Sequence, residues 1–180
     1  MAQKPMLVWL DLEMTGLDVH KDSILEIATV ITDDQLHEVA VGPNLIIHQT
    51  DDILAGMDDW CTKQHTKSGL VAAVKASTVS LAQAEEQTLS FLKEQSEKGA
   101  LLCGNSIGSD RAFLKQYMPQ LEAFFGYRIL DVSAIKECVQ RWYKNDLQAK
   151  FAKKDMHRAL PDVYESIEEL RHYRNYFFKV

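Results

Sequence analysis

The sequence predicts an α/β fold with a mixed central sheet flanked by helices. Two apolar runs early in the chain, Met6 to Met14 and Ile24 to Thr32, are typical of buried strands. From residue 80 onward, strand patterns alternate with amphipathic helix patterns. Because the chain has no internal repeat, low-complexity segment or Pro/Gly-rich linker, we expect a single domain over residues 1–180.

The first three strands follow from apolar composition and turn residues. Met6 to Met14 stops at Thr15-Gly16, which predicts a central strand buried on both faces. Ile24 to Thr32 ends at the Asp33-Asp34 turn, so the chain is expected to open with antiparallel strands. Leu45 to His48 is predicted as a further short strand.

Helices dominate the remainder of the chain. The first, Ser80 to Lys98, begins with the capping box Ser80-x-x-Gln83 and is expected to stop at Gly99. The last predicted helix has a continuous apolar face and should pack on the sheet. The elements after the first helix are a strand at Ala100 to Cys103, a helix at Asp110 to Tyr117, a strand at Arg128 to Leu130, and helices at Ser133 to Tyr143 and Asp162 to Phe177.

Composition limits the class of protein. A chain of 180 residues that is 46% hydrophobic can bury one sizeable core. The net charge of -6 and the lack of a basic tail disfavour binding to long nucleic acid, which requires many Lys and Arg contacts to phosphates. The apolar start, Met6 to Leu10, is too short for a signal peptide or membrane span and predicts a cytoplasmic protein. Three separated cysteines predict neither a disulfide framework nor a zinc site.

Two acids near the end of the first strand suggest a metal site. Asp11 and Glu13 are two residues apart, so their side chains point to one face, about 7 Å apart at Cα. Buried carboxylates are costly unless a cation or hydrogen-bond donors compensate them, and oxygen ligands suit Mg²⁺ or Mn²⁺. Ordinary surface strands also alternate acids with apolar residues, so this pattern alone leaves both interpretations open.

Three further residues are ambiguous when taken singly. Asp110 closes Asn105-Ser-Ile-Gly-Ser-Asp110, between a predicted strand and a helix, and is either a site carboxylate or a helix cap. Asp162 follows Pro161 and stands three residues before Glu165, so it is either a ligand or part of a capping box. His157, in the polar loop before the last helix, is either solvated or a general base.

Four segments together resemble the oligoribonuclease family. In chain order they are Asp11-x-Glu13, Asn105-Ser-Ile-Gly-x-Asp110, Tyr127-Arg-x-Leu-Asp131-x-Ser133 and His157-x-Ala-x-x-Asp162. Met57-Asp-Asp-Trp60 and His65-Thr-x-Ser-Gly69 are also similar to that family. The family belongs to an exonuclease superfamily that uses Asp-Glu-Asp-Asp plus a histidine. The resemblance covers essentially the whole chain and implies a ribonuclease H-like exonuclease fold.

The resemblance implies a role for each site residue. Four carboxylates would bind two divalent metal ions, Mg²⁺ or Mn²⁺: Asp11, Glu13, Asp110 and Asp162. His157 would be the general base. Leu17 and Trp60 would bracket the bases, and stacking on an aromatic ring tolerates any base. The residues implied to contact the 5′ phosphate are His65, Ser106, Arg128 and Ser133.

The resemblance also implies a substrate and an assembly. Family members degrade RNA fragments of a few nucleotides from the 3′ end to 5′-mononucleotides, by a two-metal-ion mechanism. They are homodimers in which the region of Tyr127 and Arg128 reaches the partner's site. The chain departs from the family pattern at Ser109, where relatives often carry glutamine, and at Pro161, where an acid is common. Neither departure replaces a ligand, so we expect activity to survive.

Two other functions share these residues. A proofreading-type exonuclease on longer DNA uses the same carboxylates and histidine, but the net charge and the phosphate-contacting residues disfavour it. A binding module for dinucleotides or RNA ends would keep the fold without the chemistry, and the complete carboxylate set disfavours that. The sequence therefore predicts a 3′-to-5′ exoribonuclease for short RNA oligonucleotides, especially dinucleotides, without membrane association.

Overall fold

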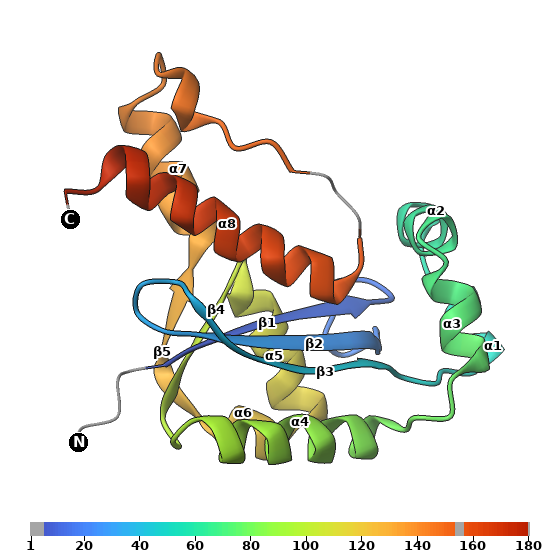
Figure 1. Cartoon of the computed structure of the whole chain (residues 1–180). Coiled ribbons are helices and arrows are strands. Elements are labelled where there is room, and N and C mark those ends of the chain that lie inside the picture. The colour runs from blue at the N-terminus through green and yellow to red at the C-terminus, as the bar shows by residue number, and fades with distance from the viewer. Residues whose placement is uncertain (1–5, 154–156, 180) are drawn as a thin grey trace.

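A five-stranded mixed sheet forms the centre of the computed structural model, which describes residues 6–153 and 157–179 (Figure 1). The strand order is β3-β2-β1-β4-β5. β1 (Leu7–Met14) pairs antiparallel with β2 (Ile24–Thr32), and β2 pairs antiparallel with β3 (Glu38–Ile46). On its other side β1 pairs parallel with β4 (Ala100–Gly104), which pairs parallel with β5 (Phe125–Asp131). The predicted mixed sheet is confirmed.

Helices cover both faces of this sheet (Figure 1). One face packs against α4 (Leu81–Gln95), α5 (Ile107–Tyr117) and the short α6 (Pro119–Glu122). The other face packs against α7 (Val132–Trp142) and α8 (Ala159–Phe177). The remaining helices are α1 (Asp51–Ala55), α2 (Asp59–Lys67), α3 (Leu70–Ala76) and a one-turn 3₁₀ helix at Leu147–Ala149. Among the described helices, none has the length and apolarity that crossing a membrane requires.

Alternate side chains of β1 enter two different cores. Leu10 and Leu12 are buried in the core that contains the apolar residues of α4 and α5. Trp9 is buried in the core that contains those of α7 and α8. Because successive side chains on a strand point to opposite faces, Asp11 and Glu13 share the face of Trp9. The alternation of a single strand thus directs both acids toward α8.

The third strand differs from its prediction. It spans Glu38–Ile46 rather than Leu45 to His48 and lies at an edge of the sheet. Val39 and Val41 are exposed, and Gly42-Pro43 falls inside the strand. Edge strands tolerate proline and need no continuous apolar run, so the sequence pattern that identifies buried strands is weak here.

Both ambiguous acids lie inside helices. α5 starts at Ile107 and α8 at Ala159, so Asp110 and Asp162 each fall in a first helical turn and neither is a cap residue. The cap positions belong to Ser106 and Arg158, and neither makes a side-chain capping hydrogen bond. The predicted helix starts at Asp110 and Asp162 are therefore wrong by one turn, and the capping alternative for both acids is excluded.

The predicted end of the helix with the capping box is also wrong. Ser80 and Gln83 make the expected reciprocal hydrogen bonds, but α4 ends at Gln95 instead of Lys98. The short helices α1, α2, α3 and α6 were not predicted, because helices of one or two turns show little periodicity. His157 precedes the first residue of α8, as predicted, and residues 154–156 of the preceding loop lie outside the described part of the chain.

Candidate active site

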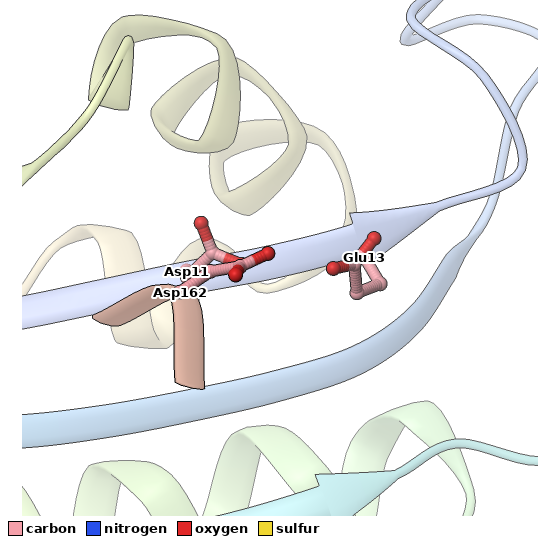
Figure 2. Close-up of side chains that lie close together, drawn as sticks. All are labelled: Asp11, Glu13 and Asp162. Atoms are coloured by element: carbon pink, nitrogen blue, oxygen red, sulfur yellow. The ribbon is translucent and has the colours of Figure 1, made fainter. Parts of the chain in front are cut away.

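Three carboxylates from β1 and α8 meet at the carboxyl end of β1. Asp11, Glu13 and Asp162 each offer one oxygen, and these oxygens lie within 4.8 Å of one another. Figure 2 shows Asp162, from the first turn of α8, over the strand that carries the other two. The Oδ1 atom of Asp162 is buried and has no hydrogen-bond partner among the described residues. A buried carboxylate oxygen without a donor is the kind of ligand that a divalent cation takes.

Asp110 joins this group through the backbone of β1. Its Oδ1 accepts a hydrogen bond from the N–H of Leu12 at 2.9 Å. β1 and β4 pair only from Leu7 to Trp9, so the N–H of Leu12 lies beyond their ladder and can bond to a side chain. The divergence of two parallel strands at their carboxyl ends is where α/β sheets commonly place a site. It puts Asp110 close enough to raise the pKa of Asp11.

Burial, together with repulsion from nearby carboxylates, makes these four acids reluctant to ionise. Burial is the main cause in every case, and it raises the pKa of Asp11 well above its ordinary value, with Asp110 and Glu13 adding repulsion. The pKa of Glu13 rises to about 8, that of Asp110 to about 7 and that of Asp162 to about 6. A bound cation would relieve this cost, so the oxygen-only donor set fits divalent metal ions.

His157 lies at the edge of the carboxylate cluster. Its backbone has φ 49°, a left-handed conformation that non-glycine residues adopt rarely. Its ring meets the ring of Trp60 edge-on, with centroids 5.5 Å apart and an interplanar angle of 84°. The imidazole is also close enough to lower the pKa of Asp162. The segment before α8 and the start of α2 therefore meet beside the acids.

His65, on the buried face of α2, lies at the Glu13 end of the cluster. Its side chain is almost fully buried, its Nε2 is 2.9 Å from the carbonyl oxygen of Met14, and its Nδ1 is 3.8 Å from Oε2 of Glu13. Burial lowers the pKa of His65. His65 was predicted to contact phosphate, and in the structure it contacts Met14 and Glu13 at the carboxyl end of β1.

Leu17 and Trp60 are large apolar side chains left in solvent. Leu17 is 81% exposed and Trp60 is 57% exposed, which suits stacking on a flat ligand. Leu17 lies in the β1–β2 loop, where Asp22 accepts hydrogen bonds from the hydroxyl of Thr15 at 3.1 Å and from the N–H of Asp18 at 2.9 Å. The buried Asp22 carboxylate therefore holds the loop that presents Leu17.

Ser106 and Ser133 meet at the N-termini of α5 and α7. Their hydroxyl oxygens are 3.1 Å apart, and the N–H of Ser106 donates both to Oγ of Ser133 at 3.0 Å and to Oδ1 of Asp131 at 2.9 Å. Tyr127 and Arg128 lie exposed on the edge strand β5, with the guanidinium 5.0 Å from the centroid of the tyrosine ring. The structure thus brings the two serines together and leaves Tyr127 and Arg128 facing solvent.

Glu26 and Arg158 belong to the same region but were missed at the sequence level. Glu26 is fully buried in β2, directly opposite Glu13, and forms an ion pair with Arg158. The available signal was a single acid inside the otherwise uncharged strand Ile24–Thr32. Such an acid requires a buried partner.

Residues 8–170 match the family model described as exonuclease, which defines the class of protein, and the carboxylate cluster lies within the matched residues. The oligoribonuclease of Marinobacter nauticus is 54% identical over 181 residues and covers 100% of both chains. That of Pseudomonas aeruginosa is 53% identical and covers 97% of both, and the mitochondrial oligoribonuclease of Mus musculus is 52% identical over 99% of this chain and 75% of its own. The chain belongs to the oligoribonuclease family of exonucleases.

A solved structure supports the fold. The zinc-bound complex of Escherichia coli exonuclease I with single-stranded DNA superposes with a TM-score of 0.74 at 16% identity. The match covers 96% of this chain and 41% of that chain, so this protein spans less than half of exonuclease I. The predicted ribonuclease H-like exonuclease fold is confirmed, and so is the predicted class of enzyme, a hydrolytic exoribonuclease.

Proposed function

We propose that the protein hydrolyses RNA oligonucleotides of a few nucleotides, dinucleotides above all, to 5′-mononucleotides in the cytoplasm, using two divalent metal ions. The observation that carries this proposal is the partly buried cluster of Asp11, Glu13 and Asp162, in which Oδ1 of Asp162 has no hydrogen-bond partner within the described part of the chain. Asp110 would complete the ligand set, and oxygen ligands favour Mg²⁺ or Mn²⁺. Bound ions would supply Lewis-acid stabilisation of charge on the attacking and leaving oxygens.

The remaining residues would position the substrate and move a proton. His157 would accept the proton of the attacking water, and its contact with Trp60 limits the rotation of the imidazole. Trp60 and Leu17 would stack on the bases, which gives affinity without sequence preference. The paired hydroxyls of Ser106 and Ser133 would bind the 5′ phosphate, together with Arg128 as a forked donor. His65, whose Nδ1 lies 3.8 Å from Oε2 of Glu13, would contact the substrate at that end of the carboxylate cluster.

The test of this function is turnover of 5′-phosphorylated RNA and DNA length series, starting from dinucleotides, with Mg²⁺ or Mn²⁺ and with chelator. We expect chelator-sensitive release of 5′-mononucleotides that is fastest on the shortest RNA. Preference for long DNA would instead support a proofreading-type exonuclease. Tight dinucleotide binding without turnover in Mn²⁺ would support a binding module.

The His157→Ala variant should lose turnover while keeping affinity. We expect kcat to fall by roughly 10²- to 10⁴-fold, the usual contribution of a general base, with little change in KM. Steady-state kinetics on a dinucleotide would measure both constants. His37→Ala is the matched control, because His37 is an exposed histidine in the β2–β3 turn, and it should behave as the unsubstituted protein. Unchanged kcat for His157→Ala would remove the histidine from the mechanism.

We also propose a homodimer in which Tyr127 and Arg128 act on the partner's site. Tyr127 is 80% exposed on an edge strand, and the guanidinium of Arg128 lies 5.0 Å from the centroid of its ring. Arg111 donates a hydrogen bond to the carbonyl oxygen of Tyr127 at 3.1 Å and so supports the backbone at this point. An exposed aromatic residue and an arginine are typical of the centre of a protein interface.

A mixing experiment tests this arrangement. Arg128→Ala and His157→Ala should each be impaired alone, but a dimer formed from one chain of each has one site with both residues intact. Mixing equal amounts after reversible dissociation should therefore restore up to about a quarter of the native sites. Activity of the mixture that equals the mean of the two variants would show that Arg128 does not act across a dimer.

A further inference from the structure

Glu26 is a buried carboxylate that lies beside Glu13, one of the proposed metal ligands. It lies in β2 with no exposed surface, and its Cα partner across the antiparallel ladder is Glu13. Its neighbours Ala28 and Val30 are buried in the core beneath α7 and α8, so Glu26 shares that face. Like charges directly opposite each other destabilise a strand pair unless another group compensates them.

Three hydrogen bonds from the start of α8 compensate this carboxylate. Arg158 donates hydrogen bonds from Nε to Oε2 and from Nη2 to Oε1, both at 2.9 Å, and so forms a bidentate ion pair with Glu26. The N–H of Ala159 donates to Oε2 at 3.2 Å. Because α8 has no side-chain cap of its own, Glu26 satisfies a free N–H at its start and places negative charge at its positive end.

This attachment lies between His157, which precedes α8, and Asp162 in its first turn, the two residues of this segment that the proposed mechanism uses. His157 is the residue immediately before Arg158, and its left-handed backbone must be held in place by its surroundings. Asp162 is one turn later, and its N–H donates to the carbonyl oxygen of Arg158 at 3.1 Å. A shift of Arg158 would therefore move both His157 and Asp162.

We infer that Glu26, acting through Arg158 and the N–H of Ala159, is a positioning residue that sets His157 and Asp162 against Asp11 and Glu13. The inference rests on the proposed roles of His157 and Asp162. Among the described residues, Glu26 makes hydrogen bonds with Arg158 and Ala159 and with neither His157 nor Asp162, so its effect on these two residues would be on their geometry.

The rest of α8 is held to the sheet independently of Glu26. Tyr164 donates to Glu38 of β3 at 2.8 Å, and Arg174 donates to the carbonyl oxygen of Gln35 at 3.1 Å. Val163, Ile167 and Tyr173 are buried in the core beneath the helix. Loss of the Glu26 charge should therefore displace the first turn of α8 without detaching the helix.

The test uses Glu26→Gln, with Tyr164→Phe as the matched control, because Tyr164→Phe breaks a different bond between α8 and the sheet. We measure kcat and KM on a 5′-phosphorylated diribonucleotide, Mn²⁺ affinity of the metal-free protein by calorimetry, and Tm. For Glu26→Gln we expect kcat to fall about tenfold or more, since small misplacements of reacting groups are costly, with KM changed less than about twofold. Its Mn²⁺ affinity should fall, and Tyr164→Phe should keep all three properties.

Arg158→Lys provides a second variant, because it keeps the charge but loses the forked geometry. We expect the same separation of kcat from KM. Native kcat and Mn²⁺ affinity in a folded Glu26→Gln protein would overturn the inference, as would equal losses in Tyr164→Phe. Failure of both Glu26→Gln and Arg158→Lys to fold would assign the pair to stability alone and also overturn it. Lack of turnover by the unsubstituted protein, or full turnover by His157→Ala, would instead refute the proposed function.

Discussion

Asp11→Asn is expected to abolish turnover and to stabilise the metal-free protein at the same time. Asp11 is one of the three acids whose oxygens converge, and loss of a metal ligand removes several kcal/mol of transition-state stabilisation, about a thousandfold or more in kcat. In chelator, however, the negative charge of Asp11 destabilises the folded protein. Burial and the nearby Asp110 and Glu13 hold its pKa well above the ordinary value, and an amide of the same shape carries no charge.

The two halves of this prediction are measured separately. Thermal unfolding at pH 8 in chelator should give a higher Tm for Asp11→Asn than for the unsubstituted protein, by about 2 to 4 °C for each kcal/mol relieved. Added Mn²⁺ should raise the Tm of the unsubstituted protein and leave that of the variant almost unchanged. Asp34→Asn, which alters an exposed acid in the β2–β3 turn, should change neither property. Metal-dependent turnover by Asp11→Asn would exclude Asp11 as a ligand.

The acids of β1 could be predicted from the sequence because their placement depends on local alternation. A continuous apolar run identifies a buried strand, and a spacing of two residues puts Asp11 and Glu13 on one face. The structure adds which helix that face meets. Trp9, on the same face, packs against α7 and α8, and this fixes Asp162 as the third member of the cluster.

Asp110 and Asp162 could not be assigned from local pattern, because aspartate near a helix start serves equally as a cap. The distinction depends on where each helix begins, and both begin one turn earlier than their capping signals suggest. Tertiary contacts decide this. Ser106 is held by Asp131 and Ser133, and Arg158 is held by Glu26, so each chain segment enters its helix before the acid is reached.

Glu26 shows a second limit of sequence reasoning. An acid inside an apolar strand signals a buried partner, but Arg158 lies 132 residues away and nothing in the strand identifies it. The exposed edge strand β3 was displaced in the prediction for a related reason, since its residues carry little burial pattern. Local periodicity therefore located the centre of the site, while its support from other elements required the tertiary structure.

The stability of the metal-free protein should fall as the pH rises from about 4.5 to about 8. When folding raises the pKa of an acid, the native state binds more protons than the unfolded state at every pH between the unfolded pKa and the native pKa. The free energy of unfolding therefore decreases as the pH rises across that interval. The pKa of Asp162 rises to about 6, that of Asp110 to about 7 and that of Glu13 to about 8. The lowered pKa of His65 acts in the opposite direction, but it is one group against several.

Divalent metal should reverse this dependence, because it binds the ionised carboxylates. The gain in Tm on adding Mn²⁺ is expected to be small at pH 5 and largest near pH 8, where the metal-free protein is least stable. Calorimetric scans at both pH values, with chelator and with saturating Mn²⁺, provide the measurement. Glu13→Gln should flatten the metal-free curve above pH 6, since it removes the group with the pKa of about 8. A metal-free Tm that rises from pH 5 to pH 8 would mean that the four acids ionise without cost, and the physical case for a metal site between β1 and α8 would then fail.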